Sequence, residues 1–508
     1  MSCMSKPPLS PRTPLRTPSP SPRKICRTPE DFNASFEADI SAEKCFLRAS
    51  AESPTQLLVE RVARLSLSPS PVPKLDFDTD YDLIASPPPQ RPNEILKKEN
   101  TKASAIPKFY YPYGKPVPEA VNKAALDSVK QAFSKLPSGI ARKSCDLIQV
   151  CKAINFPVYC KRPLYEAIAR ASGHGSVTAE LPPITFENFS SFWEEMTSKA
   201  HDEASRFVFT LAAARCSKFS SSDVREYLIR EDFTSLISDL ISTHPGLDFL
   251  LDSPKFHRYY TDTVVVRIFW TVNRSFINDK IPIAKVRRSN LIEAIRKLEK
   301  TDDTNEISDF FSYAHFFVIY CTFHELDRDG DMLLTPSDMR RYADGVLTAA
   351  VIERIFRGAG LKGAKTGKRR PVIGLCEFVA FMLAEVDKRN LASIDYWFRC
   401  LDVEGTGVLT AEEMRYFYAS VESELREYEL LHFSDVIDML FDYAAPMKRR
   451  IALSDLRKCG LAHRFLNTFV NKEKFLEQET TEGERAPRMS EWELFCLEEY
   501  HRMAAQDL

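Results

Sequence analysis

Three observations predict an all-α fold for this 508-residue chain, built as an elongated helical body of tandem helix–loop–helix units with a disordered N-terminal tail. From residue 119 onward, apolar residues recur at i, i+3 and i+4, which is the helical period. No stretch alternates apolar and polar residues strongly enough to predict a long strand. Two acidic twelve-residue loops, at 327–338 and 402–413, interrupt the helical pattern. Short strands that pair such loops are the most β-structure we expect.

The composition excludes several functional classes. The 69 Lys and Arg nearly cancel the 71 Asp and Glu, which leaves a net charge of −2, so the whole chain is no polycation for nucleic acid. Its apolar runs fall short of the ~20 residues of a membrane helix. The 12 Cys form no CxxC pair, which argues against a disulfide scaffold or a zinc module. With no secretory signal at its start, the chain is expected in the cytoplasm or the nucleus, and with no nucleic-acid or membrane partner.

The N-terminal tail, residues 1–104, is predicted to be disordered and regulatory. Of the 32 prolines, 20 lie in the first 120 residues, and residues 1–29 carry basic side chains but no acid. Phosphorylation of its Ser/Thr-Pro dipeptides would reverse the charge of this segment. These dipeptides begin at Ser10, Thr13, Thr17, Ser19, Ser21, Thr28, Ser53, Ser68, Ser70 and Ser86.

Residues 105–118 are predicted to form an extended docking segment in which aromatic residues stand between prolines, because proline restricts its own φ and the residue before it. Helical periodicity follows over 119–300, which predicts an N-terminal helical domain. Across the whole body, the ranges with helical spacing are Phe207–Ala214, Val224–Ile229, Phe233–Ile241, Thr263–Val272, Asn290–Leu298, Ile307–Leu326, Ala350–Phe356, Glu377–Glu385, Ile394–Leu401, Phe433–Phe441 and Leu453–Phe469.

The loop at 327–338 has the ligand spacing of an EF-hand calcium loop. A hard cation takes six to eight oxygens, and loop positions one, three, five, seven and twelve supply them. Thr335 as N-cap and Pro336 at the first helical position predict the exit helix. Position six is Met332, where glycine is usual, and a short Asp at position twelve makes six-coordinate Mg²⁺ a competitor for Ca²⁺. The candidate ligands are Asp327, Asp329, Asp331, the Leu333 carbonyl and Asp338.

The loop at 402–413 repeats the pattern. Gly407 stands at the turn, and Thr410 with Glu413 forms a capping box that opens the exit helix. Its weak points are a bulky Glu at position three and a neutral Thr at position five. The candidate ligands are Asp402, Glu404, Thr406, the Val408 carbonyl and Glu413.

Each loop is expected to pair with a nearby degenerate hand that lacks acidic ligands, because EF loops pair through a short strand at position eight. Segments 279–291, 371–383 and 450–459 have the pattern of such a strand followed by an exit helix. Residues 301–390 and 391–480 are therefore predicted as two EF-hand units, and 481–508 as a C-terminal helix. No phosphate-binding loop, GxSxG or HExxH motif is present, so no catalytic site can be assembled.

A set of short segments spread along the chain is jointly specific: Ile106-Pro-Lys-Phe-Tyr-Tyr-Pro, Thr243-His-Pro-Gly-Leu, Arg267-Ile-Phe-Trp-Thr-Val-Asn-Arg-Ser, Asp309-Phe-Phe-Ser-Tyr, Glu325-Leu-Asp-Arg-Asp, Glu353-Arg-Ile-Phe, Tyr396-Trp-Phe-Arg-Cys-Leu-Asp and Tyr416-Phe-Tyr. Together they resemble the B-double-prime class of regulatory subunits of protein phosphatase 2A over about residues 106–505. In that family, too, the first calcium loop carries a bulky apolar residue at position six and Asp at position twelve. Glu404 and Thr406 depart from the family's usual Asp at both positions.

The resemblance implies a non-enzymatic, calcium-binding regulator. A protein of this class docks on the HEAT-repeat scaffold, contacts the catalytic subunit and directs Ser/Thr dephosphorylation of selected phosphoproteins. Family members act in cell-cycle control, replication licensing and centrosome or microtubule organisation. Two alternatives remain open: an EF-hand calcium sensor that works without a phosphatase, and a cytoskeletal or centrosomal linker that binds microtubules through its basic tail.

Overall fold

The computed structural model describes residues 111–173, 182–216, 224–274, 279–361, 372–446, 450–480 and 489–505. The predicted tail, 1–104, with all of its Ser/Thr-Pro sites, lies outside the described residues. So does the first part of the predicted docking segment.

The described chain is helical almost throughout, which confirms the predicted all-α class. Its α-helices are α4 (Glu119–Ser134), α5 (Ile148–Ala153), α6 (Lys161–Ala171), α7 (Phe186–Thr197), α8 (Glu203–Ala213), α9 (Thr234–Thr243), α10 (Pro254–Ile268), α11 (Ile283–Arg288), α12 (Leu291–Leu298), α13 (Tyr313–Leu326), α14 (Pro336–Met339), α15 (Ala349–Phe356), α16 (Leu375–Val386), α17 (Leu391–Leu401), α18 (Ala411–Glu424), α19 (Phe433–Ala444), α20 (Leu453–Lys458), α21 (Ala462–Val470), α22 (Lys472–Thr480) and α23 (Glu491–Ala505).

Three antiparallel pairs of two-residue strands join helix–loop–helix units. Strand β1 (Tyr227–Leu228) pairs with β2 (Ile281–Pro282), β3 (Leu333–Leu334) with β4 (Ile373–Gly374), and β5 (Val408–Leu409) with β6 (Ile451–Ala452). Strands β3 and β5 belong to the two acidic loops, and their partners belong to hands without acidic ligands. This is the pairing with a nearer hand that the sequence predicts.

Three helix predictions differ from the structure. The helix predicted over Val224–Ile229 is absent, and this range contains β1, because its apolar residues pair with β2 instead of lining a helix. The helix predicted over Ile307–Leu326 begins only at Tyr313, where Ser312 caps it by accepting a hydrogen bond from the His315 N–H. The helix predicted over Leu453–Phe469 is divided into α20 and α21, and Gly460 lies in the break.

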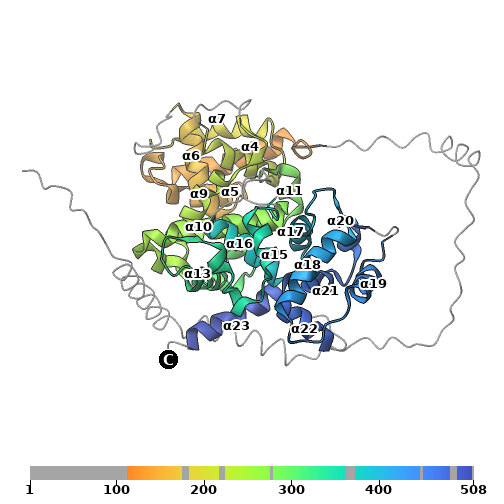
Figure 1. Ribbon diagram of the computed structural model, residues 1–508. Coiled ribbons are helices and arrows are strands. Elements are labelled where there is room, and N and C mark those ends of the chain that lie inside the picture. The colour runs from red at the N-terminus through yellow and green to blue at the C-terminus, as the bar shows by residue number, and fades with distance from the viewer. Residues whose placement is uncertain are drawn as a thin grey trace, which may run out of the picture.

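The helices share one apolar core, and Figure 1 shows how they follow one another through the body. Helices α4 to α7 and α9 form one end, α10, α13 and α16 lie in the middle, and α18 to α22 form the other end, with α23 along the lower edge (Figure 1). Buried apolar side chains from Val129 to Met503 form one cluster. All four tryptophans belong to it.

The described part of the docking segment is fastened to the body. The carbonyl of Tyr113 accepts from the backbone N–H of His201 at 2.8 Å, and the Pro112 carbonyl accepts from Arg287 at 2.8 Å. Gly114 has φ +89°, and a Cβ there would lie 2.6 Å from Cβ of Asp202, so the segment approaches the start of α8 too closely for a larger residue.

A buried polar network joins the middle of the body to the last EF-hand unit. Glu385 at the end of α16 accepts from Lys388 Nζ at 2.8 Å, from Asn471 Nδ2 at 2.7 Å and from the Tyr342 hydroxyl at 3.2 Å. Burial opposes the charge of Glu385, but Lys388, Lys474 and Asn471 hold the pKa of this carboxyl well below its usual range. Lys388 is as buried as Glu385, so loss of Glu385 would leave a buried ammonium without its partner, whereas loss of Lys388 would leave Glu385 only the longer 3.7 Å pair with Lys474.

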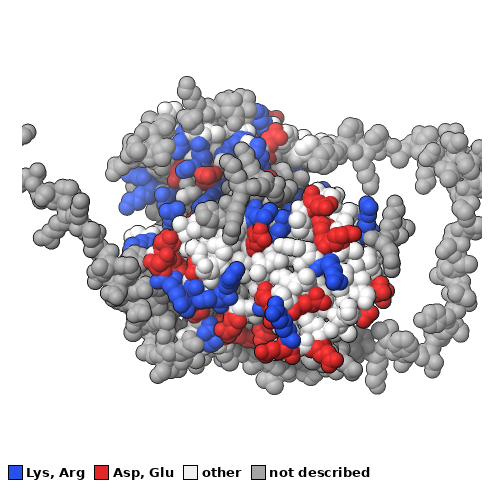
Figure 2. All heavy atoms as spheres, viewed as in Figure 1, with Lys and Arg blue, Asp and Glu red and all other residues white. Residues whose placement is uncertain are grey.

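The visible surface carries mixed charge. Figure 2 shows Lys and Arg interspersed with Asp and Glu on this face, in keeping with the small net charge. Within the described ranges, no helix has both the length and the hydropathy needed to span a bilayer.

Candidate metal centre

Local sequence positions the first acidic loop between α13 and α14. Thr335 caps α14: its Oγ1 accepts from the backbone N–H of Asp338 at 3.4 Å, and Pro336 occupies the first helical position. Leu334 is fully buried in the strand pair, where it anchors the end of the loop to the core. Within the acidic first half of the loop, Asp327 is buried, and Asp329 and Asp331 face solvent.

The first loop brings three predicted ligands together. Carboxylate oxygens of Asp327, Asp329 and Asp331 lie within 4.8 Å of one another. Burial, together with the adjacent Asp329 and Asp331, raises the pKa of Asp327 to about 6. Three carboxylates held this close repel one another, so this donor set suits a hard divalent cation.

Met332 adopts the backbone that this loop usually assigns to glycine. Its φ is +64°, close to the +79° of Gly407 at the same position of the second loop. A left-handed conformation costs a non-glycine residue about 1–2 kcal/mol. The side chain of Met332 packs against the core, which offsets this cost. Met332 therefore does not prevent the turn, although its residue type departs from the usual loop pattern.

Asp338 at position twelve is held by neighbours within its own hand. Its Oδ2 accepts from the Thr335 backbone at 2.7 Å, and its Oδ1 accepts from Arg341 at 2.8 Å. The same guanidinium donates to the Leu326 carbonyl at 2.6 Å. Partial burial raises the pKa of Asp338, but hydrogen bonds from Thr335 and Arg341 outweigh it and keep the pKa below its usual value. Arg341 thus bridges the end of the entering helix and the start of the exit helix.

The second loop lies between α17 and α18, and its two end carboxylates point into it. Asp402 accepts from the backbone N–H groups of Thr406 at 2.9 Å and Gly407 at 2.8 Å. Glu413 accepts from Val403 at 2.7 Å and Glu404 at 3.0 Å through Oε1, and from the Thr410 backbone at 3.0 Å through Oε2. The predicted capping box is therefore present, and Glu413 reaches across the loop.

The other predicted ligands of the second loop do not converge on one point as the three aspartates of the first loop do. Glu404 is exposed, and the Thr406 hydroxyl donates to the Val408 carbonyl at 3.0 Å, so two predicted ligands are bonded to each other. Among the described residues, only the Asp327–Asp329–Asp331 group forms a tight acidic cluster.

Sequence reasoning missed two arginines beside these loops. Arg341 follows Asp338 by three residues on the exit side, and this i,i+3 spacing signals an ion pair. Arg354 contacts the end of α17 across 46 to 48 residues of sequence, and no local pattern announces that contact.

The paired hands define an EF-hand protein, and comparison with known proteins supports this class. Residues 202–301 match the family model described as an EF-hand domain. This match covers α8 to α12 and the β1–β2 pair, and it does not include either acidic loop.

Relatives place the chain more narrowly. The B'' delta regulatory subunit of serine/threonine-protein phosphatase 2A from Mus musculus is 37% identical over 432 residues, which are 83% of this chain and 82% of that protein. The B'' beta protein of Homo sapiens is 35% identical over 416 residues, which are 80% of this chain and 69% of that protein. The B'' alpha protein of Homo sapiens is 37% identical, and the match spans only 36% of its length. A chain of a solved PP2A PR70 holoenzyme is 43% identical and covers 55% of this chain and 99% of its own length, with a TM-score of 0.49.

The chain belongs to the family of B'' regulatory subunits of serine/threonine-protein phosphatase 2A. Its relatives are named as regulatory subunits and not as catalytic phosphatases, which confirms the predicted class and the predicted resemblance.

Proposed function

We propose that the protein docks on the scaffold and catalytic subunits of phosphatase 2A and directs Ser/Thr dephosphorylation of selected phosphoproteins. The likeness to the B'' delta protein along 82% of that protein's length carries this proposal. In this role the chain supplies no catalytic group. It positions the active site of another protein, so its own requirement is a body rigid enough to hold two partners in register.

Calcium at the two acidic loops is the proposed means of making the body rigid. The ligands would be Asp327, Asp329, Asp331, the Leu333 carbonyl and Asp338 in the first loop, and Asp402, Glu404, Thr406, the Val408 carbonyl and Glu413 in the second. The acidic cluster of the first loop supports this assignment. Neutralising clustered carboxylates fixes the angle between the entering and exit helices. Mg²⁺ is the competitor at the first loop, because Asp338 is short and bonded to Arg341.

The test compares the intact protein with an Asp327→Ala/Asp329→Ala variant, with and without Ca²⁺. Calcium at 100 times its Kd should stabilise the wild type by about 2.7 kcal/mol per site. The variant should lose the part of this stabilisation that comes from the first loop. Capture of purified phosphatase 2A scaffold should weaken in parallel. Glu427→Ala/Glu429→Ala removes two exposed acids outside the loops and serves as the matched control.

Equal melting and equal scaffold capture with and without Ca²⁺ would overturn the metal assignment. Calcium binding without any capture of scaffold would instead favour a phosphatase-independent sensor. Salt-sensitive tubulin binding by the tail would favour the cytoskeletal linker.

We further propose the domain division 1–104, 105–118, 119–300, 301–390, 391–480 and 481–508, with a cytoplasmic location and the nucleus and centrosome as alternatives. The β3–β4 and β5–β6 pairs, one within each of the two predicted EF-hand units, support the division. Limited proteolysis should cut near these boundaries, and a fluorescent fusion of the full chain tests the location.

A further inference from the structure

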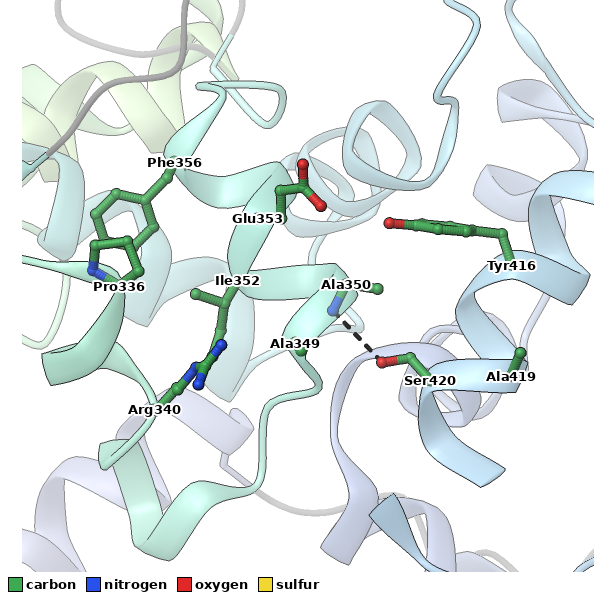
Figure 3. A pocket seen from close by; sticks show the side chains of 10 residues that line it. All are labelled: Pro336, Arg340, Ala349, Ala350, Ile352, Glu353, Phe356, Tyr416, Ala419 and Ser420. Atoms are coloured by element: carbon green, nitrogen blue, oxygen red, sulfur yellow. Dashed lines mark hydrogen bonds between the residues drawn. The ribbon is translucent and has the colours of Figure 1, made fainter. Parts of the chain in front are cut away.

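Helix α15 is fastened at its N-terminus to the exit helix of the second hand. The backbone N–H of Ala349 donates to Glu424 Oε1 at 2.9 Å, and that of Ala350 donates to Ser420 Oγ at 3.4 Å. Figure 3 shows the second bond crossing the space between α15 and α18. Two side chains of α18 therefore satisfy backbone donors that a helix start leaves free.

The same helix is fastened to the entering helix of the second hand through Arg354. Its guanidinium donates to the carbonyls of Cys400 at 2.7 Å, Arg399 at 3.2 Å and Asp402 at 2.9 Å. These carbonyls end α17, and Asp402 is the first residue of the loop. A cation at a helix C-terminus also complements the helix dipole.

Close packing beyond α15 strengthens this end of the contact. Arg399 on α17 donates in return to the Gly360 carbonyl at 2.7 Å. A Cβ at Gly360 would lie 2.3 Å from the Tyr396 ring, so the chain leaving α15 lies directly on α17. Because α15 is held to α17 and to α18, it cannot keep all its contacts if the angle between those two helices changes.

On another side, α15 packs against α14, the exit helix of the first loop. Pro336 and Arg340 of the α14 segment line a groove of about 590 Å³ together with Ile352 and Phe356 of α15 and residues of α18 (Figure 3). Helix α14 carries Asp338, the predicted position-twelve ligand of the first loop. One helix thus contacts the hand of the second loop and the ligand-bearing helix of the first.

We propose that α15 couples the two calcium loops and that Arg354 is the positioning residue for this coupling. The proposal rests on calcium binding at both loops, as proposed above. Calcium in the second loop fixes α17 against α18, and through Arg354, Ser420 and Glu424 it fixes α15. Helix α14 then loses less conformational entropy when calcium binds the first loop, so the first loop binds calcium more tightly.

Calorimetric calcium titration of the full chain tests the coupling. Glu413→Gln silences the second loop, and it should weaken the first loop about fivefold, the lower end of typical coupling. In an Arg354→Gln background the same change should leave the first loop unaffected. Arg357→Gln is the matched control. It removes the same charge three residues further on, just past the end of α15, from an exposed side chain that pairs only with Glu353 among the described ion pairs.

Hydrogen exchange supplies a second readout. With the first loop silenced by Asp327→Ala/Asp329→Ala, calcium should slow amide exchange across 349–356 in the wild-type and Arg357→Gln backgrounds, and not with Arg354→Gln.

The outcomes separate the two proposals. If both loops bind calcium in the titration and Glu413→Gln does not change the calcium affinity of the first loop, the coupling is overturned and the proposed function stands. If calcium binding releases no heat at either loop, the proposed calcium sites and the coupling are both overturned, and capture of the scaffold still tests docking on the phosphatase. Persistent coupling in Arg354→Gln would overturn the role of that residue. If Arg354→Gln does not fold, Ser420→Ala/Glu424→Gln frees the other end of α15, and unchanged coupling there overturns the proposal.

Discussion

Two histidines on α13, His315 buried and His324 half-buried, make the stability of the body sensitive to acid. His324 lies against Tyr320, with a ring-centroid separation of 4.7 Å, and burial lowers its pKa to about 4. Burial, and then the adjacent Arg267, lower the pKa of His315 well below its usual value. The folded protein keeps both imidazoles neutral, whereas the unfolded chain protonates them near pH 6.5. The contribution of these two histidines to stability is therefore fully present above about pH 6.5, and it is lost as the pH falls towards 4.

We expect protonation linked to His324 alone to lower the free energy of unfolding by about 2 kcal/mol when the pH falls from 7 to 5. His324→Gln should remove that part of the pH dependence, because glutamine does not titrate. Urea denaturation at the two pH values measures it. His432→Gln, at an exposed position, should behave as the wild type, and a wild-type slope in His324→Gln would contradict the assignment.

At the residue scale, spacing alone predicted where the acidic cluster would form. Asp327, Asp329 and Asp331 are close in sequence, so one loop conformation brings them together. The loop spacing predicted Asp338 as a metal ligand. It did not predict that Arg341 donates to the same carboxylate and so competes with the metal for it.

The starts of α14 and α18 are correctly predicted. Thr335 and Thr410 begin their helices as expected, because a capping side chain and the residue three positions later are a local signal. The helix prediction over Val224–Ile229 is wrong because its partner, β2, lies some 50 residues further along, and pairing across that distance has no local signature. Strand pairing therefore overrode a short apolar period.

Removing the cap of α18 should be costly. Thr410 Oγ1 accepts from the Glu413 backbone at 3.3 Å and donates to the Glu413 carboxylate at 3.1 Å. Thr410→Ala is expected to lower the free energy of unfolding by about 1 kcal/mol and to weaken calcium binding at the second loop, because Glu413 loses a contact that orients it. Thermal melting and calorimetry measure the two effects. Ser423→Ala, exposed near the other end of α18, is the control, and an equal loss there would argue against a specific cap.

At the scale of the whole molecule, α23 closes the middle of the body. It packs on α13 and α16, and Trp492 Nε1 donates to His315 Nδ1 at 3.4 Å while Tyr500 meets Phe317 at a ring-centroid distance of 5.8 Å. Arg389 pairs with Glu491 at 2.6 Å at the start of the helix. Sequence reasoning predicted a helix here but not the surface that it covers, because that contact joins segments far apart in the chain.

Trp492→Ala should destabilise the protein by about 3 kcal/mol, because it leaves a cavity beside α13. The side chain of Trp492 is 8% exposed, whereas that of Leu494 on the same helix is 42% exposed. Leu494→Ala should therefore change stability by less than about 0.5 kcal/mol. Chemical denaturation compares the two variants, and similar losses would mean that α23 is not docked as described.

The strand pairs also have a consequence for biosynthesis. Leu228 meets Ile281, Leu334 meets Ile373, and Leu409 meets Ile451, so the first hand of each couple leaves the ribosome some 40–50 residues before its partner. At a synthesis rate of about 5–20 residues per second, the first hand of each pair exposes its apolar face for several seconds before its partner is made. Translation therefore opens three successive windows in which a chaperone can engage the growing polypeptide, and each window shuts when the next hand emerges.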